Sequence, residues 1–224
     1  MTKTKTKITE LATDPGKDCP LCPRLVEFRH EQRTIHPEWH NAPVDTWASA
    51  QGDADVRLLI VGLAPGLRGA NRTARPFTGD WAGDLLYATL LKFGFANGSY
   101  GAEADDGLEL NECAITNAVR CVPPENKPTG KEINTCRPFL VNTFERFSNL
   151  GTILTLGKIA HDSTARTLGQ KLKDVPFAHA SSHDMNGFSV ISSYHCSRYN
   201  TNTGRLTTQM FEEVFGMVRE SLNS

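Results

Sequence analysis

Four of the six cysteines have a spacing that suits a metal site. Cys19 and Cys22 form a Cys-x-x-Cys pair, and Cys121 and Cys136 follow much later, separated from each other by fourteen residues. One close pair and two dispersed cysteines, brought together by folding, suit a four-thiolate site for either zinc or a 4Fe–4S cluster. A thioredoxin-type redox pair is disfavoured, because such a pair normally sits between a strand and a helix and this one lies in a proline-rich segment.

The two remaining cysteines carry no comparable signal. Cys113 begins a predicted strand, where a free thiol behaves as a small apolar side chain, so we expect it to be buried. Cys196 lies in a polar loop, where we expect it to be neither a metal ligand nor part of the core.

The composition indicates an ordinary soluble protein. The 224 residues are 39% hydrophobic and 22% charged, which fits one compact domain that needs no disulfide to fold. No apolar run approaches the roughly 18 residues of a membrane helix, and no export signal is recognisable, so we expect a cytoplasmic protein. The formal charge of −1 argues against binding nucleic acid by bulk positive charge.

Alternating strand and helix patterns predict a mostly parallel sheet covered on both faces. We expect residues 1–18 to be a disordered tail and residues 19–224 to form a single domain, with an irregular layer up to about residue 51. Residues 97–112 contain five acids and are expected to be a solvated loop. Strands are predicted at 56–61, 113–119, 152–156 and 188–192, and helices after Asp80, at 130–147, from Lys158 and from about Thr207.

Four short motifs follow these elements in a fixed order. The first strand ends in Gly62-Leu63-Ala64-Pro65-Gly66, and residues 71–80 read Asn-Arg-Thr-Ala-Arg-Pro-Phe-Thr-Gly-Asp. Residues 115–121 read Ile-Thr-Asn-Ala-Val-Arg-Cys, and residues 195–197 read His-Cys-Ser, with Thr-Gly-Arg-Leu at 203–206. With the four placed cysteines, this set resembles the uracil-DNA glycosylase superfamily, most closely its family-five branch, often called UDGb.

The resemblance implies a three-layer α/β/α sandwich with a central four-stranded parallel sheet. It also implies a 4Fe–4S cluster held by Cys19, Cys22, Cys121 and Cys136. The implied activity is hydrolysis of the N-glycosidic bond of uracil in DNA, and of deaminated purines such as hypoxanthine and xanthine, after the base is flipped out of the duplex. The partner would be DNA containing such bases, and we expect a monomer.

Two of the motifs depart from the pattern of the better-known branches. Those branches place a carboxylate or an amide in the first loop to position the attacking water, whereas this chain has Leu63 and Ala64 there. Ala64 is carried over as a base-binding position. The last motif usually reads His-Pro-Ser, and here Cys196 replaces the proline, so this loop is less constrained.

The resemblance assigns roles to three residues. Phe77 is the candidate for stacking on the extruded base, with a packing role over the following helix as the alternative. Asn117 offers a donor and an acceptor in one plane, which match uracil O4 and N3–H; capping of the next loop is its alternative role. His195 is the candidate donor to uracil O2, where negative charge develops as the base departs.

The remaining site residues are an acid and five arginines. Asp80 either activates the attacking water or caps the following helix, and one carboxylate can do both. Arg68, Arg72 and Arg75 precede Phe77 without an intervening acid, and Arg198 and Arg205 lie in a second acid-free stretch. We expect these five to bind DNA phosphates on a narrow basic face that the near-zero total charge hides.

Two other functions remain open from the sequence. One is a family-four-like glycosylase restricted to uracil, which would be expected to carry a glutamate where Leu63 stands. The other is a non-catalytic zinc or iron–sulfur module that binds nucleic acid.

Overall fold

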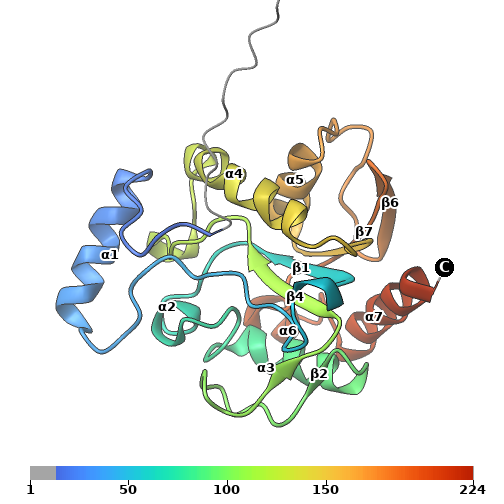
Figure 1. Ribbon diagram of the computed structural model, residues 1–224, viewed down its shortest axis with the longest axis horizontal. Helices are drawn as coiled ribbons and strands as arrows, with labels where there is room; N and C mark the ends of the chain where they lie inside the picture. Colours follow the sequence, from blue (N-terminus) through green and yellow to red (C-terminus); the bar gives the residue numbers. More distant parts are fainter. Residues whose placement is uncertain (1–13, 224) are drawn as a thin grey trace, which may run out of the picture.

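The computed structural model describes residues 14–223, so residues 1–13 of the predicted tail lie outside the described residues. A central sheet lies between two groups of helices (Figure 1). The helices are α1 (Pro23–Ile35), α2 (Ala70–Thr73), α3 (Trp81–Lys92), α4 (Gly130–Arg146), α5 (Lys158–Thr167), α6 (Arg198–Asn202) and α7 (Thr208–Asn223), with 3₁₀ turns at Asp53–Asp55 and Pro124–Asn126. The strands are β1 (Leu58–Gly62), β2 (Ala96–Asn97), β3 (Glu109–Leu110), β4 (Cys113–Asn117), β5 (Thr152–Leu156), β6 (Ser181–Met185) and β7 (Phe188–Ser193).

The main sheet has the strand order β4-β1-β5-β7-β6. The first four strands pair in parallel, which confirms the predicted parallel sheet. An antiparallel edge strand, β6, was not predicted, because Ser-Ser-His-Asp-Met lacks the aliphatic run of a buried strand. The Asn186-Gly187 turn that joins β6 to β7, with positive φ at both residues, is the local signal that predicts such a hairpin.

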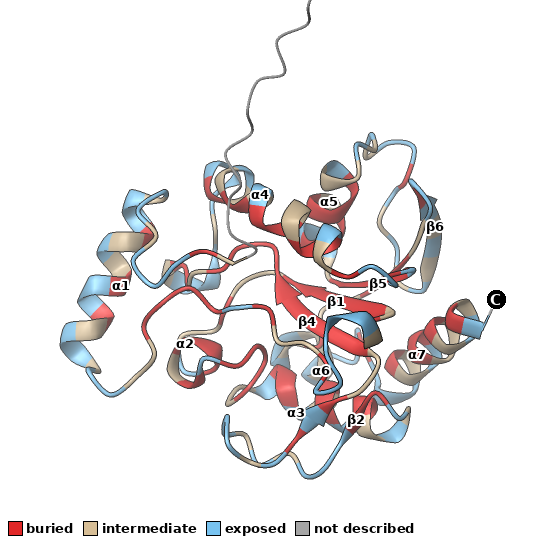
Figure 2. Cartoon of the chain, viewed as in Figure 1, coloured by how far each residue is buried: buried red, intermediate tan, exposed pale blue. Residues whose placement is uncertain are grey.

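Both faces of the sheet are buried, which explains why β1 is aliphatic at every position except its final glycine (Figure 2). Leu58 and Ile60 pack into one core with residues of α3 and α7. Leu59 and Val61 pack into a second core with residues of α4 and α5. Successive residues of a strand point to opposite faces, so a strand covered on both sides must be apolar throughout.

The N-terminal layer is more regular than predicted. Residues 23–35 form the helix α1, which the sequence pattern did not reveal because few of its side chains are both apolar and buried; Leu25 is one. The folded part also begins before Cys19. Asp14 Oδ1 accepts hydrogen bonds from Arg120 Nη1 (2.6 Å) and from the backbone N–H of Thr46 (3.0 Å), so the predicted domain boundary at residue 19 is too late.

Candidate active site

A cavity of about 390 Å³ lies at the carboxyl edge of the parallel strands. β1 ends at Gly62, β4 ends at Asn117, and His195 follows the end of β7, so three loops converge at this edge. Open parallel sheets bind ligands at this edge. The five residues predicted to be catalytic or base-binding all line the cavity: Ala64, Phe77, Asp80, Asn117 and His195.

Asn117 places an amide at the floor of the cavity. The residue is 3% exposed, and its side chain has no hydrogen-bond partner among residues 14–223. Gly62, its register partner in β1, leaves the room that this side chain needs, because a Cβ there would lie 2.4 Å from Asn117 Oδ1. An amide that lines a cavity and is not engaged by neighbouring groups is free to bind the polar edge of a ligand, so this one is suited to reading such an edge.

Phe77 and His195 present two rings to the same space. Their ring centroids lie 6.0 Å apart with an angle of 30° between the ring planes. Phe77 is 6% exposed, has a φ of 54° and also contacts the core beneath α3, so its packing and its place in the cavity wall coexist. A strained backbone at a cavity wall is typical of a side chain that must point in one direction.

His195 remains neutral over most of the pH range. Burial lowers the pKa of His195 to about 4, because the charged imidazolium loses its water. Asn200 Nδ2 donates to the carbonyl oxygen of His195 (2.8 Å), which ties this loop to α6. A neutral imidazole can still donate one N–H, and that is sufficient to stabilise a developing oxyanion.

Asp80 lines the cavity and also caps α3. Its Oδ1 accepts a hydrogen bond from the backbone N–H of Ala82 (3.1 Å), which confirms the predicted cap. Burial raises the pKa of Asp80 above its ordinary value, while hydrogen bonds from the backbone of Gly83 and Ala82 oppose the shift. The other oxygen, Oδ2, lies against Gly69, where a Cβ would approach it to 2.5 Å. Oδ1 is therefore engaged in the cap of α3, whereas Oδ2 is not.

Leu63 and Ala64 contribute an apolar wall to the cavity. The backbone N–H of Val119 donates to the carbonyl oxygen of Leu63 (3.0 Å), so the first loop is fixed to the segment that follows β4. The position at which other branches carry a carboxylate or amide thus faces the cavity with an aliphatic side chain.

Arg75 is not available to bind DNA, and this prediction was wrong. Its guanidinium forms two hydrogen bonds to Asp106 (2.7 and 2.8 Å), and the side chains are 5% and 6% exposed. The guanidinium also lies 4.8 Å from the centroid of the Trp47 ring. Arg75 holds the pKa of the Asp106 carboxyl well below its usual range. The acidic segment 97–112 is consequently anchored to the site loop rather than fully solvated.

The other four predicted arginines reach the surface. Arg72 pairs with Glu103 in that acidic segment (2.8 Å), whereas Arg68 is exposed and forms no ion pair within residues 14–223. Arg198 lines the cavity and lies over the Trp81 ring at 5.4 Å, and Arg205 lies over the Tyr194 ring at 4.6 Å. The acidic segment therefore neutralises two of the five predicted arginines, and the basic face is reduced to the other three.

The four predicted cysteine ligands converge beneath α1. Cys19, Cys22, Cys121 and Cys136 line one small cavity between α1, α4 and the segment that follows β4. Within residues 14–223, no three Cys, His, Asp or Glu side chains are arranged to hold a single metal ion. Burial raises the pKa of Cys22 to about 11 and that of Cys121 to about 12.

Arg29 gives the cysteine cavity an unbalanced positive charge. The residue is 1% exposed, and its Nη1 donates to Cys121 Sγ (3.5 Å) while Nη2 donates to the carbonyl oxygen of Cys19 (3.1 Å). Its buried Nε has no partner among the described residues. The backbone N–H of Arg120 donates to Cys136 Sγ (3.4 Å). A buried cation and N–H donors aimed at sulfur fit a group of thiolates that carries net negative charge.

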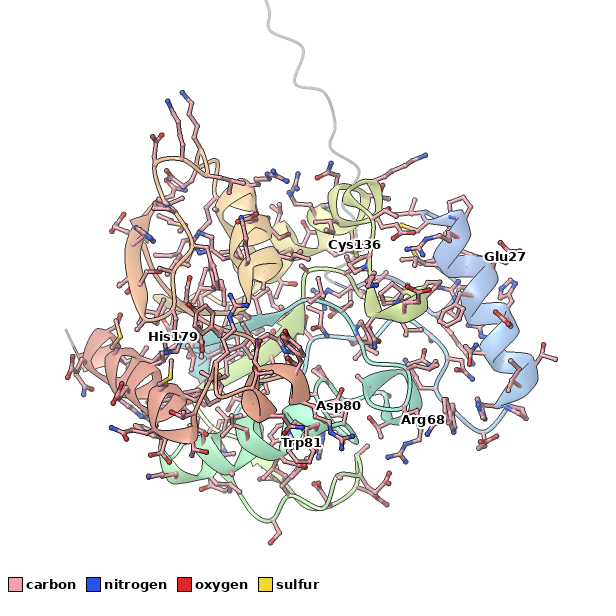
Figure 3. The ribbon with its side chains drawn as sticks, turned by 180° about the vertical axis from the view of Figure 1, so that it is seen from behind. Glu27, Arg68, Asp80, Trp81, Cys136 and His179 are labelled. Carbon is pink, nitrogen blue, oxygen red and sulfur yellow. The ribbon has the colours of Figure 1, made fainter. Side chains whose placement is uncertain are left out.

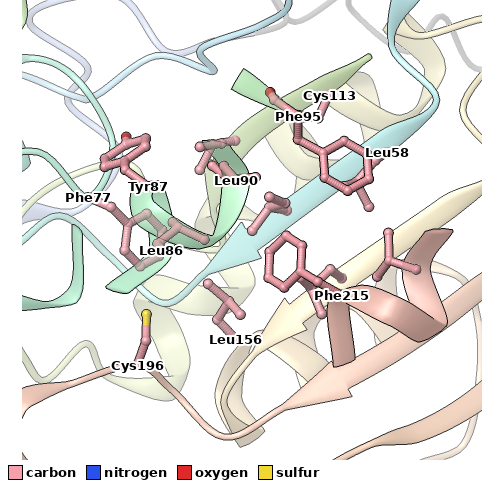
Figure 4. Close-up of a cluster of buried hydrophobic side chains, with 14 of the residues drawn as sticks. Leu58, Phe77, Leu86, Tyr87, Leu90, Phe95, Cys113, Leu156, Cys196 and Phe215 are labelled. Carbon is pink, nitrogen blue, oxygen red and sulfur yellow. The ribbon is translucent and has the colours of Figure 1, made fainter. Parts of the chain in front are cut away.

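The other two cysteines are both core residues. Cys113 is fully buried in β4, as predicted. Cys196 is also fully buried and packs in the core that includes Phe77 and Leu86 (Figure 4), so the prediction that it lies outside the core was wrong. The loop turns inward directly after His195, which the polar sequence around Cys196 did not indicate.

Trp81 and Asn126 are among the cavity residues that the sequence did not single out. Trp81 is the first residue of α3, immediately after Asp80, and is 47% exposed (Figure 3). A large aromatic side chain at a helix start beside a candidate acid was the available signal. Asn126 lies in the proline-rich segment between Cys121 and Cys136, where no motif marked it.

Comparison with known proteins agrees with this geometry. The family model of the uracil DNA glycosylase superfamily matches residues 49–219, and the chain belongs to this superfamily. It is similar to the Type-5 uracil-DNA glycosylase of Thermus thermophilus, with 39% identity over 200 residues that cover 88% of this chain and 90% of the relative. The Type-5 uracil-DNA glycosylase of Mycobacterium leprae is 41% identical over 207 residues, 88% of each chain. These findings confirm the predicted resemblance, including its family-five branch.

A family-four relative is more distant. The Type-4 uracil-DNA glycosylase of Thermotoga maritima is 30% identical over 158 residues, which cover 70% of this chain and 66% of the relative. Separately, none of the helices within residues 14–223 is both long and apolar enough to cross a membrane.

Proposed function

We propose that this protein is a DNA-repair glycosylase that hydrolyses the N-glycosidic bond of uracil in DNA. The observation that carries the proposal is the unpartnered Asn117 amide at the floor of a cavity that Phe77 and His195 also line. The names of the Type-5 relatives support it. A base within a duplex cannot reach such a floor, so the nucleotide must be flipped out of the helix.

Asn117 and Phe77 would recognise the extruded base. The amide of Asn117 offers one acceptor and one donor, which pair with N3–H and O4 of uracil. Extrusion of the nucleotide costs a few kcal/mol of stacking in the duplex. Phe77 would offset part of this cost by supplying a face on which the base stacks. Where the bound base displaces water from the cavity, each of these contacts contributes more than it would at the surface.

His195 and Asp80 would carry the chemistry. As the glycosidic bond breaks, positive charge develops on the sugar and negative charge on the base. A neutral His195 N–H directed at uracil O2 stabilises the departing anion more than the neutral base, which is the requirement for catalysis. Asp80, whose pKa burial raises, can orient or deprotonate the attacking water through the oxygen that does not cap α3.

We also propose that deaminated purines are substrates. Hypoxanthine and xanthine present an N–H beside a carbonyl oxygen, as uracil does, so one amide can read all three. A cavity of about 390 Å³ with an apolar wall at Leu63 and Ala64 supports entry of the larger ring system. A uracil-only enzyme of the family-four kind is disfavoured, since it would be expected to carry a glutamate at position 63.

Cys19, Cys22, Cys121 and Cys136 are proposed to hold a 4Fe–4S cluster. The shared cavity, the N–H donors to sulfur and the unbalanced charge of buried Arg29 support a negatively charged thiolate group. Zinc in a four-thiolate site is the alternative, and the iron content and visible absorbance of the purified protein distinguish the two. A cluster held by these four residues would cross-link α1, α4 and the segment after β4.

Arg68, Arg198 and Arg205 are the proposed phosphate contacts, with Arg72 in competition with Glu103. A few exposed arginines around the cavity suffice to hold one distorted stretch of backbone. The monomeric state and the cytoplasmic location remain predictions.

The test is an alkali-cleavage assay on matched oligonucleotides that contain uracil, hypoxanthine, xanthine or no lesion. We expect abasic product from the lesion substrates and none from undamaged DNA. Tight binding to DNA with no abasic product from any substrate would instead indicate the non-catalytic module.

A further inference from the structure

Three side chains that line the cavity are exposed and form its rim: Trp81, Asn126 and Arg198. Two of them are already engaged. Trp81 Nε1 donates to Thr201 Oγ1 (2.9 Å), and Arg198 lies over the Trp81 ring. Asn126 differs, because its side-chain amide has no hydrogen-bond partner within residues 14–223. One rim residue thus presents a free donor and a free acceptor to whatever enters.

The backbone at Asn126 is held in an unfavourable conformation. Asn126 has a φ of 57° and the preceding Glu125 has a φ of 55°, so two consecutive residues other than glycine adopt the left-handed region. Asparagine tolerates this region, but glutamate rarely adopts it. Such strain persists where the surrounding structure imposes it, and it concentrates at ligand-binding sites.

The structure imposes this conformation from α1 and α4. Arg24 Nη2 donates to the carbonyl oxygen of Lys127 (3.1 Å), directly after Asn126. The same guanidinium binds Glu132 with two hydrogen bonds of 2.7 and 2.8 Å. Glu132 in turn accepts from the backbone N–H of Thr129 (2.7 Å) in the capping box of α4. The segment that carries Asn126 is therefore fixed before any ligand arrives, which reduces the entropic cost of a contact.

Depth within the cavity indicates which part of a ligand meets Asn126. Asn117 lies at the floor and is 3% exposed, whereas Asn126 is exposed at the rim. A nucleotide that enters base first brings its sugar and phosphate to the rim. Asparagine side chains commonly donate to phosphate oxygens in protein–DNA complexes.

We infer that Asn126 is a further substrate-binding residue, which donates its side-chain N–H to a phosphate that flanks the extruded nucleotide. This inference rests on the proposed glycosylase function. It assigns to the segment between Cys121 and Cys136 a direct contact with DNA at the rim of the cavity.

The first test compares two glycine variants. Asn126→Gly and Glu125→Gly each remove one exposed side chain and relieve the same left-handed strain, so they differ chiefly in the contact under test. We expect Asn126→Gly to lower kcat/KM on a uracil duplex by about 10- to 100-fold, the effect of one hydrogen bond to a charged group. Glu125→Gly should stay within about twofold of the parent, as an exposed charge does.

The second test locates the contact. Uracil substrates carry an uncharged methylphosphonate at either of the two phosphates that flank the deoxyuridine. For the parent protein, one of these replacements should lower kcat/KM, and in Asn126→Gly that same replacement should cost nothing further, because the two changes remove one interaction. The loss in Asn126→Gly should also be equal on uracil and hypoxanthine.

The outcomes separate the inference from the proposed function. Parental activity in Asn126→Gly, additive losses at both phosphates, or a loss confined to one base would overturn the phosphate contact while the glycosylase proposal stands. A parent protein that releases neither base would overturn both. Thermal unfolding of the two glycine variants shows whether each is folded.

Discussion

Gly62 lies against both the proposed base reader and the proposed stacking ring. This last residue of β1 has no side chain, and a Cβ there would lie 2.4 Å from Asn117 Oδ1 and 2.5 Å from Phe77 Cζ. Gly62→Ala therefore adds one methyl group between the proposed base reader and the proposed stacking ring. Ordinary carbon contacts begin at about 3.5 Å, so each of these two side chains must move by about 1 Å.

The expected losses in activity and stability differ in size. Both obstructing atoms are the far ends of side chains beside a cavity, so they can turn aside and the fold can persist. Overpacking at such a site costs about 1 kcal/mol of the free energy of unfolding, or a fall of about 2–4 °C in Tm. A displacement of 1 Å in a positioned catalytic group reduces rate by about 10²-fold.

Single-turnover release of uracil from a duplex, measured beside thermal unfolding, tests this prediction. Gly216→Ala in α7 is the matched control, because nothing lies within 4 Å of a Cβ at that position. It should keep the parental rate. If Gly62→Ala released uracil at a rate within about threefold of the parent, the positions of Asn117 and Phe77 would not control the rate, which contradicts the roles proposed for them.

Five further predictions follow from particular contacts. His195→Ala should lower the single-turnover rate by about 10²- to 10³-fold. Burial lowers the pKa of His195 to about 4, whereas the unfolded value is about 6.5, so between these pH values the unfolded chain binds the extra proton. The free energy of unfolding should therefore rise with pH over this range. In urea unfolding measured at several pH values, His195→Gln should reduce that slope. Asp106→Asn strands the buried Arg75 guanidinium and should lower the free energy of unfolding in urea by about 3 kcal/mol, with no change in the salt dependence of DNA binding. Arg198→Ala should instead reduce the slope of log affinity against log salt by about 1, and an unchanged slope would remove Arg198 from the phosphate contacts. Arg29→Gln should lower iron content and visible absorbance in the purified protein, and full iron retention would show that the buried charge does not hold the cluster.

The convergence of Phe77, Asn117 and His195 was predictable from sequence for a physical reason. Aliphatic runs mark buried parallel strands, and the carboxyl ends of such strands meet at one edge of the sheet. Residues that directly follow or end these runs, such as Asn117 and His195, must therefore come together. The convergence of the four cysteines on one cavity was also predictable, because side chains proposed to share one bound group must come together in the fold.

The side chains whose places the sequence did not predict are positioned by contacts between distant segments. Nothing near Arg75 in sequence shows that its partner is Asp106, 31 residues away, or that Trp47 covers it. Cys196 has polar neighbours in sequence but turns into the core. Asn126 reaches the cavity on a segment whose next carbonyl group is bound by Arg24, over 100 residues away. In each case the direction of one side chain is decided by packing between elements, which a local pattern does not encode.

We propose that the Asn117 amide reads the extruded base and that the groups around this cavity then cleave that base from its sugar. The most direct measurement is the release of free uracil from a uracil-containing duplex under single-turnover conditions, by the parent protein and by Asn117→Ala. We expect free base and an abasic strand with the parent, and a rate lower by about 10²-fold or more with the variant. No free uracil from the parent, or equal rates for the two proteins, would contradict it.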